Sequence, residues 1–269
     1  MIIRPSFIYL KARGSSMQEI YENLKLVSID HIDLHESYEP NRLEKTKESI
    51  MRDGFIRHPI LVTETSEGRY IVIDGVHRFT SLKALGCRVV PVQNIMSTQY
   101  SIGAWQHKVP SGAWWKRLQQ DPSLPWTTEI RRATPFITMK KGQDEQYLYS
   151  GDLGHQKFEA WAKVVSSYSD CCSVERIAHH ACSTSLTSSD ILMKYQPLSF
   201  EEIASIVRAG ETVPAGVTRF NISGRCLNLQ VPLNILKQDT HVCETWYNFL
   251  QDKVKNLRCY TEKIYLVEQ

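Results

Sequence analysis

A run of polar residues follows an apolar strand segment in the first third of the chain. The run is Asp74-Gly75-Val76-His77-Arg78, and a helix is predicted directly after it. A carboxylate such as Asp74 is a ligand that Mg²⁺ prefers, and this ion usually bridges nucleotide oxygens as well. Gly75 lets the backbone approach an oxygen-rich ligand, and His77 and Arg78 carry donors for phosphate. The run predicts a magnesium and phosphate site, and the alternative is an ordinary turn with a capping Asp and a solvated Arg.

The elements around this run predict a small α/β unit. Apolar and β-branched segments indicate a strand followed by a short turn at residues 24–33 and strands at 60–63, 70–73 and 89–93, and amphipathic segments indicate helices at 41–53 and 79–85. Gly54 and Gly86 stand just past the two helices, where glycine commonly ends a helix. The polar run therefore lies at the carboxyl end of a strand and the amino end of a helix, a place that suits phosphate.

A second α/β portion is predicted after an aromatic-rich stretch that begins near Tyr100. Trp114 and Trp115 predict a helix that covers the first portion, and a hairpin is expected at 136–139 and 146–148. A helix at 158–165, a strand at 191–195 and the Ser199-x-x-Glu202 capping box of a further helix follow. We expect an N-terminal extension at 1–16, a nucleotide-binding domain at 17–125 and a smaller C-terminal α/β domain at 126–269.

Composition excludes several classes of protein. The chain has 269 residues, of which 42% are hydrophobic and 23% charged, as in ordinary globular domains. Its formal net charge of +3 is far from that of a histone-like DNA binder, although a local basic patch stays open. No apolar stretch approaches the roughly 20 residues that cross a bilayer or forms a signal-peptide core, so we expect a cytoplasmic protein without membrane partners.

The seven cysteines show no CxxC pair and no zinc-finger spacing, so reduced thiols are expected. One local cluster of soft ligands could serve a haem or a metal. It comprises Cys171, Cys172, His179, His180 and Cys182. The alternative for each member is an ordinary buried cysteine or surface histidine.

The polar run, preceded by the predicted helix at 42–53 and by His58-Pro59-Ile60, resembles the nucleotide motif of the ParB/sulfiredoxin-like superfamily. Sulfiredoxins carry a catalytic cysteine just before the His-Arg pair, where this chain has Val76. Chromosome-partitioning members carry a Gly-Glu-Arg-Arg motif and a helix-turn-helix domain, and neither pattern is evident here. The resemblance implies a ParB/sulfiredoxin-like fold for the N-terminal domain.

The free L-serine kinases of this superfamily match at several separated points. The pair His35-Glu36 resembles the family's His-Glu pair, Trp105 falls at a substrate-contacting tryptophan, and Thr218-Arg219 resembles a serine-binding segment. Phe220 stands where the family has a histidine. The resemblance implies phosphoryl transfer from ATP to free L-serine, which gives O-phospho-L-serine and ADP.

The resemblance also implies roles for these residues. Glu36 would be the general base with His35 as its orienting neighbour, Asp74 would hold Mg²⁺, and Gly75, Val76, His77 and Arg78 would bind the phosphates of ATP or of ADP as an alternative donor. Substrate contacts would come from Glu36, Trp105, Thr218, Arg219 and Phe220. The alternatives are that Glu36 is an ordinary surface carboxylate and that Arg78 only forms a salt bridge. Thr218 and Arg219 could instead cap a loop, and Trp105 could be a core residue.

Longer runs, among them Arg57 to Val62 and Thr218 to Arg225, resemble a narrower group of these kinases that serve siderophore gene clusters. This likeness implies supply of phosphoserine for a siderophore such as staphyloferrin B. It also implies a second, haem-responsive role as a DNA-binding regulator of the cluster, which is the competing interpretation of the chain. A homodimer is expected because most soluble oligomers are symmetric dimers.

Overall fold

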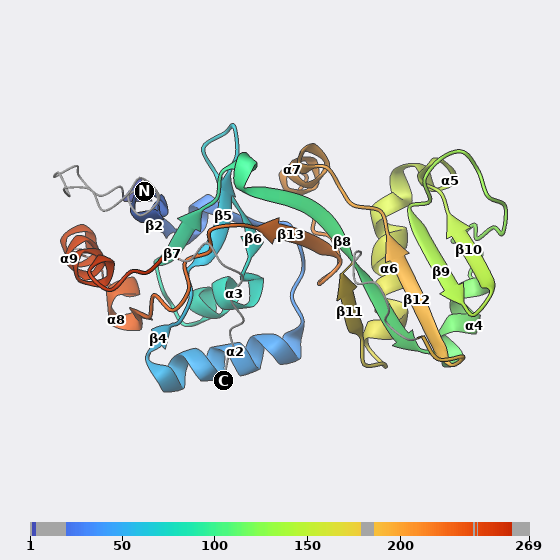
Figure 1. The fold of residues 1–269 in the computed structure, drawn as a ribbon, viewed down its shortest axis with the longest axis horizontal. Coiled ribbons are helices and arrows are strands. Elements are labelled where there is room, and N and C mark those ends of the chain that lie inside the picture. The colour runs from blue at the N-terminus through green and yellow to red at the C-terminus, as the bar shows by residue number, and fades with distance from the viewer. Residues whose placement is uncertain (1, 4–19, 179–185, 239, 241, 260–269) are drawn as a thin grey trace. The chain divides into compact units, whose positions relative to one another are not determined.

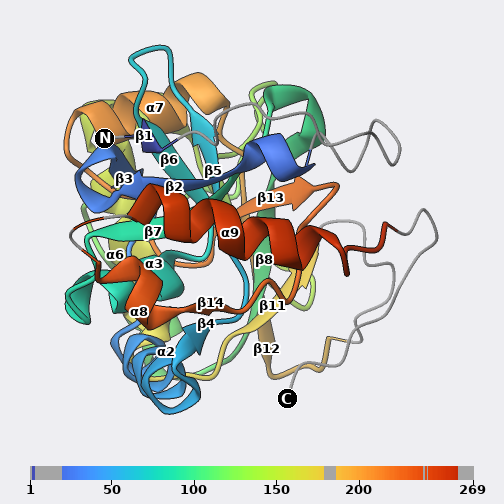
Figure 2. The same cartoon turned by 90° about the vertical axis from the view of Figure 1, so that its left-hand side faces the viewer.

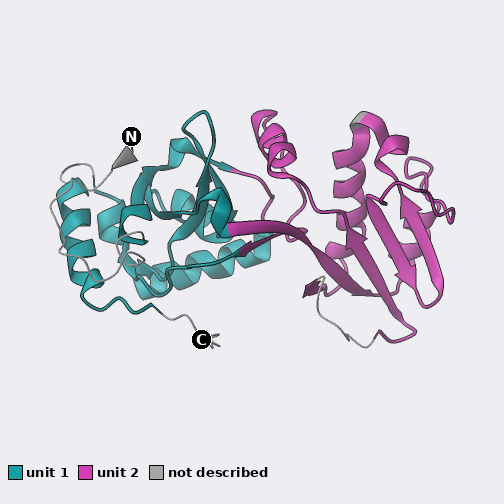
Figure 3. Cartoon of the chain, turned by 45° about the horizontal axis from the view of Figure 1, so that its top comes forward, with its two compact units in different colours: residues 1–33, 39–99, 222–269 teal, residues 34–38, 100–221 magenta. Residues whose placement is uncertain are grey.

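A computed structural model describes residues 2–3, 20–178, 186–238, 240 and 242–259. The chain forms two compact units (Figure 3). Unit 1 comprises Met1–Asp33, Glu39–Gln99 and Ile222–Gln269, and unit 2 comprises Leu34–Tyr38 and Tyr100–Asn221. Each unit combines separate stretches of the chain, so this division does not test the predicted domain boundary between residues 125 and 126, which stays a prediction.

Unit 1 contains a mixed six-stranded sheet with the order β1-β2-β7-β5-β6-β3 (Figure 1). Its strands are β1 (Ile2–Ile3), β2 (Leu24–Ser28), β3 (Ile32–Leu34), β5 (Ile60–Glu64), β6 (Tyr70–Asp74) and β7 (Val89–Asn94). The central pair β5 and β7 is parallel, whereas β2 pairs with β7 and β6 pairs with β5 in antiparallel fashion. All four strands predicted for this portion are confirmed, because each is a short β-branched run bounded by polar residues.

Helices pack on this sheet, and two of them approach the polar run. Helix α2 (Pro40–Asp53) ends at Gly54, whose φ of 74° is left-handed, and α2 packs against α3 (Val76–Ala84). Helix α9 (Val242–Val254) packs against α8 (Leu233–Leu236) and lies beside β2 and β7 (Figures 1 and 2). The remaining elements of unit 1 are the short turns η1 (Ile29–His31) and η2 (Ser97–Gln99) and the paired strands β4 (Phe55–Ile56) and β14 (Val231–Pro232).

Unit 2 contains an antiparallel sheet with the order β10-β9-β12-β8-β11, and β13 also pairs with β8. Its strands are β8 (Tyr100–Pro110), β9 (Ile137–Lys141), β10 (Asp144–Leu148), β11 (Glu175–Ala178), β12 (Asp190–Tyr195) and β13 (Thr218–Ile222). Its helices are α4 (Ala113–Gln119), α5 (Ser150–Leu153), η3 (Gly154–Gln156), α6 (Lys157–Ser169) and α7 (Phe200–Arg208).

Local signals in unit 2 predicted some of these elements correctly. The β9–β10 hairpin, α6 and β12 are confirmed. The capping box is present as well: Glu202 N donates to Ser199 Oγ over 3.2 Å, and Ser199 N donates to Glu202 Oε2 over 2.9 Å. Two donors that a helix start leaves unpaired are thereby satisfied, which explains why α7 begins where the sequence indicates.

The predicted helix with Trp114 and Trp115 is present, but the prediction that it covers the first portion of the chain was wrong. Helix α4 packs against α6 within unit 2, and the buried ring of Trp114 lies 5.2 Å from that of Tyr168 on α6. Trp114 is thus a core residue of unit 2. Among the described helices, none combines the length and the apolar character that a membrane crossing requires.

Candidate active site

The predicted strand, turn and helix around Asp74 are present in unit 1. Strand β6 is buried at residues 70–73 and ends at Asp74, Gly75 is the N-cap residue, and α3 begins at Val76. The amide of Phe79 donates to the carbonyl of Gly75 over 2.9 Å, which closes the first helical turn. The amino end of α3 thus faces the region next to the Asp74 carboxylate, as a phosphate site requires.

Gly75 is needed at this turn for two reasons. Its φ of 100° lies in the region that side chains rarely adopt, and a Cβ built there would lie 2.9 Å from Arg78 Nη2. The glycine therefore permits both the turn and the close approach of the Arg78 guanidinium.

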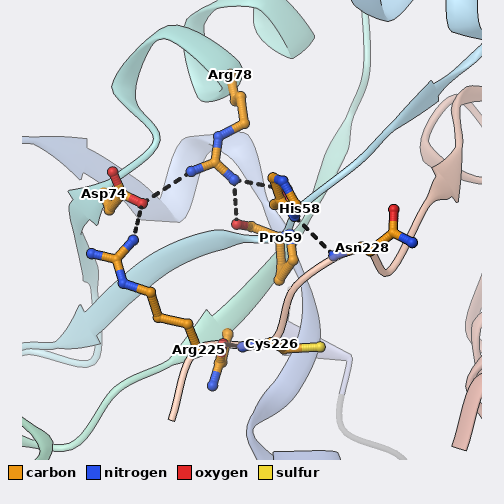
Figure 4. A network of polar contacts seen from close by, with 8 residues as sticks. His58, Pro59, Asp74, Arg78, Arg225, Cys226 and Asn228 are labelled. Carbon is orange, nitrogen blue, oxygen red and sulfur yellow. Dashed lines mark hydrogen bonds and ion pairs between the residues drawn. The ribbon is translucent and has the colours of Figure 1, made fainter. Parts of the chain in front are cut away.

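The guanidinium of Arg78 binds groups of the protein itself. Nη1 donates to the carbonyls of His58 and Pro59 over 3.0 and 2.8 Å, and Nη2 donates to Asp74 Oδ2 over 3.1 Å (Figure 4). These bonds hold the segment before β5 against the turn. They give Arg78 a structural function beside the predicted phosphate contact.

A second arginine, which the sequence did not single out for a role, also reaches Asp74. Arg225 Nη1 donates to Asp74 Oδ2 over 2.8 Å, and 37% of the Arg225 side chain is exposed (Figure 4). The carboxylate is thus flanked by two guanidinium groups. Such a cluster of positive charge beside a helix amino end favours bound phosphate.

Buried Gln93 on β7 holds the segment that carries Arg225. Its Nε2 donates to the carbonyl of Gly224 over 2.7 Å, and its Oε1 accepts from the amide of Cys226 over 2.8 Å. One side chain therefore binds the backbone on both sides of Arg225. Burial raises the pKa of the neighbouring Cys226 thiol to about 11.

The side chains of Val76 and His77 are engaged within the protein rather than directed at a phosphate. Val76 is buried in the core, so only its backbone amide faces outward from the helix start. His77 Nε2 accepts a hydrogen bond from the amide of Glu39, the N-cap residue of α2, over 3.1 Å. This bond ties the amino ends of α2 and α3 together and leaves Nδ1 as the ring nitrogen that carries the proton.

The donor set around Asp74 fits Mg²⁺ that arrives with a nucleotide. No group of three or more His, Cys, Asp or Glu side chains with metal-binding geometry occurs within the described residues. Mg²⁺ needs no such cage, because one or two carboxylates suffice when phosphate oxygens and waters complete its shell. Asp74, with 39% of its side chain exposed, can supply that carboxylate.

Glu36 lies in unit 2, in a segment fixed by the loop before β13. Val213 N donates to the carbonyl of His35, and Ser37 N donates to the carbonyl of Val213, each over 2.9 Å. The half-buried Glu36 carboxylate accepts a hydrogen bond from the amide of Gly216 over 3.0 Å. Backbone groups of Val213 therefore fix the main chain on both sides of the predicted base, and the backbone amide of Gly216 fixes its carboxylate.

His35 and Phe220 belong to an aromatic cluster beside Glu36. The buried His35 ring packs edge-on against Phe220 at 5.3 Å, and Phe220 packs against Tyr100 at 5.4 Å. This packing explains how Phe220 fits here, since an aromatic ring fills the space next to His35.

Thr218 and Arg219 are consecutive residues of β13, so their side chains leave opposite faces of the strand. Thr218 is 8% exposed, and its buried Oγ1 has no hydrogen-bond partner within the described residues. The guanidinium of Arg219 lies 4.4 Å from the ring centre of half-buried Trp105 on β8. The structure thus brings Arg219 to Trp105 and places Thr218 on the side of Phe220.

The predicted haem cluster is only partly described. His179, His180 and Cys182 lie outside the described residues. Cys171 is exposed, and its Sγ lies 3.5 Å from that of Cys172 without a disulfide. The six described cysteines are all free thiols, as expected for them.

Comparison with known proteins places these features in a family. The family model described as the ParB N-terminal domain matches residues 10–100. The chain is 66% identical over 257 residues to the ATP-dependent L-serine kinase SbnI of Staphylococcus aureus, which covers 94% of this chain and 100% of that protein.

Solved structures agree with this likeness. The structure of SbnI with a C-terminal truncation from Staphylococcus aureus is 66% identical, has a TM-score of 0.83 and covers 87% of this chain and 98% of its own. A free serine kinase in complex with AMP has a TM-score of 0.65 at 20% identity, covering 80% of this chain and 93% of its own, and it shares the fold. The chain therefore belongs to the family of ATP-dependent L-serine kinases that includes SbnI.

Proposed function

We propose that this chain transfers the γ-phosphoryl group of ATP to the hydroxyl of free L-serine and releases ADP and O-phospho-L-serine. The observation that carries the proposal is the 66% identity to SbnI across the whole of that kinase. The placement of Asp74 at a strand-to-helix turn and of Glu36 in a fixed segment supports it.

The residues proposed to bind nucleotide belong to unit 1. Asp74 would hold the Mg²⁺ that accompanies ATP, which would neutralise phosphate charge, and the backbone amides at the start of α3 would donate to phosphate oxygens. Arg225, which binds Asp74 in this structure, would be available to the phosphates if Mg²⁺ took the carboxylate. Gly75, Val76 and His77 contribute backbone, and Arg78 holds the turn in shape through its bonds to His58 and Pro59.

The residues proposed to bind serine belong to unit 2. Arg219, stacked on Trp105, provides a forked cation for the serine carboxylate, and the buried hydroxyl of Thr218 provides a polar partner for the substrate. A buried hydroxyl that finds no hydrogen-bond partner in the described part of the chain is costly, so a substrate group that binds it contributes to affinity. His35 and Phe220 form the packed support behind this side.

Glu36 acts as the general base. As the serine oxygen attacks the γ-phosphorus, the bond from that phosphorus to the oxygen that stays with ADP breaks, and the serine proton passes to the Glu36 carboxylate. The hydrogen bond from the Gly216 amide keeps the carboxylate oriented.

Three further roles rest on the resemblance and remain predictions: supply of phosphoserine for a siderophore, binding of operator DNA and binding of haem. Assembly into a homodimer and a cytoplasmic location also remain predictions, which rest on the prevalence of symmetric dimers and on the apolar pattern of the sequence. No contact among the described residues favours one of them over the kinase.

The proposal is tested by incubating the purified chain with ATP, Mg²⁺ and L-serine and following the products by phosphorus NMR. L-alanine, which lacks the hydroxyl, is the matched control substrate. We expect phosphoserine and ADP to form in the reaction with L-serine and neither product to form in the reaction with L-alanine. The same slow ATP loss with L-serine and L-alanine, from a protein that binds ATP, would refute the proposal.

A further inference from the structure

A chain of buried polar side chains lies behind the loop that contacts Glu36. His107, at 2% exposure, lies on β8, and its ring Nδ1 is 2.7 Å from the hydroxyl of Tyr168. Its Nε2 is 2.8 Å from the carbonyl oxygen of Gly216. The Tyr168 hydroxyl is also hydrogen-bonded to that of Tyr195, so the chain links α6, β12 and β8 to Gly216.

The chemistry of these groups determines which atom donates and which accepts in each of these hydrogen bonds. A carbonyl oxygen only accepts, so His107 Nε2 carries a proton and donates it to Gly216. Burial disfavours a charged ring, so Nδ1 is the acceptor and Tyr168 donates to it. Tyr195 then donates to the oxygen of Tyr168.

Gly216 connects this chain to Glu36. Its φ of 71° is left-handed, and the Arg176 guanidinium occupies the place that a side chain at residue 216 would take. Its carbonyl is bound by His107, and its amide donates to Glu36 Oε2 over 3.0 Å. Both peptide groups around one glycine are therefore fixed, one by the buried chain and one by the base.

Resting on the proposed function, we propose that His107 is a positioning residue for phosphoryl transfer. It binds the Gly216 carbonyl, and through this bond it sets the direction of the Gly216 amide, which in turn orients the Glu36 carboxylate. Tyr168 and Tyr195 keep the His107 ring in the orientation and tautomer that this contact requires.

The two tyrosines suit this task because they stay protonated. Burial raises the pKa of Tyr168 well above its usual value, and it raises the pKa of Tyr195 as well. Each hydroxyl therefore keeps its proton, and with it its capacity to donate, near neutral pH.

Two amide substitutions separate the two contacts of His107. The amide nitrogen of Gln reaches the position of Nε2 and keeps the bond to Gly216, whereas that of Asn reaches only the position of Nδ1. We expect His107→Asn to lower kcat about tenfold or more with little change in the KM for ATP, and His107→Gln to stay within about threefold of wild type. A role in packing alone would affect both variants equally, because both remove the ring.

Tyr168→Phe breaks the chain without touching Gly216, and Tyr149→Phe is its matched control. Tyr149 is a buried tyrosine of the same unit whose hydroxyl binds the carbonyl of Glu129 instead. We expect kcat to fall several-fold in Tyr168→Phe and to stay unchanged in Tyr149→Phe, with both variants folded by circular dichroism.

Nitrogen NMR of the wild-type chain tests the contact without any substitution. We expect a proton on His107 Nε2 that exchanges slowly with water, and a ring protonated only at Nδ1 would overturn the inference. Equal kcat values for His107→Asn, His107→Gln and wild type would overturn it too. An inactive wild type would instead contradict the proposed function, so the two failures are distinguishable.

Discussion

Arg225 donates a hydrogen bond to Asp74 Oδ2 over 2.8 Å, although 151 residues separate the two in the sequence. The contact exists because Gln93 binds the backbone on both sides of Arg225. The buried Gln93 side chain thus holds the segment from which the exposed Arg225 reaches the carboxylate. The nucleotide side of the site is consequently assembled from β6, α3 and the segment before β14.

Removal of Arg225 should weaken nucleotide binding and leave serine binding unchanged. We expect Arg225→Ala to raise the KM for ATP about tenfold, the loss typical of one charge-assisted contact to phosphate, with the KM for L-serine unaltered. Steady-state kinetics with each substrate varied in turn measures this. Arg52→Ala, at a 74% exposed arginine of α2, serves as the control and should behave as wild type. An equal rise in both KM values would contradict the assignment.

Replacement of Asp74 should remove the effect of magnesium on nucleotide affinity. Asp74→Asn keeps the size of the side chain but loses the charge that Mg²⁺ requires. In wild type, calorimetry should show ADP binding at least about tenfold tighter with Mg²⁺ than without it, and in the variant the two affinities should agree. A variant that keeps the full magnesium effect would place the ion elsewhere.

Gly75→Ala should be more destabilising than the same change at Gly86. Both glycines have left-handed φ values, but a Cβ meets nothing within 4 Å at Gly86 and lies 2.9 Å from Arg78 at Gly75. We expect Gly86→Ala to lower the free energy of unfolding by about 1 kcal/mol and Gly75→Ala by about 2–3 kcal/mol. Urea denaturation measures both values. Equal losses would mean that the Arg78 contact is not needed for the turn.

The thiol of Cys226 reports on the Gln93 contacts. Its pKa of about 11, raised by burial, leaves about one part in a thousand as thiolate near pH 8, so alkylation should be slow there and accelerate as the pH rises toward 11. Exposed Cys243 should react much faster, as peptide mass spectrometry of alkylated protein would show.

Gln93→Leu should speed the labelling of Cys226, because the Cys226 amide and the Gly224 carbonyl lose their partner and the segment opens more often. Gln120→Leu, at an exposed glutamine, is the matched control. Unchanged labelling of Cys226 in Gln93→Leu would show that the segment is held by other contacts.

The sequence predicted the elements whose signals are local. β5, β6, α2 and α3 follow from short apolar periods and from glycines past the helix ends, and α7 follows from its capping box. Strands β8 and β13 were missed, because aromatic and polar residues mix along them and their stability comes from pairing with distant segments.

The same limit applies to the site. Asp74 and Gly75 lie within one motif, so their placement could be predicted, whereas the contacts of Arg225 with Asp74 and of His107 with Gly216 join residues more than a hundred positions apart. Nothing in the local pattern of Gln93 distinguishes it from an ordinary strand residue. The opposite faces of Thr218 and Arg219 could have been inferred only if β13 had been predicted as a strand.

The most direct test of the account is the rate of phosphoserine formation by Glu36→Gln at saturating ATP and L-serine. Gln keeps the shape and can still accept from the Gly216 amide, but it cannot take up the serine proton. We predict a rate at least about a hundredfold below wild type with ATP affinity unchanged, while Glu129→Gln, at an exposed glutamate of the same unit, stays at the wild-type rate. A Glu36→Gln enzyme that forms phosphoserine as fast as wild type would contradict the account.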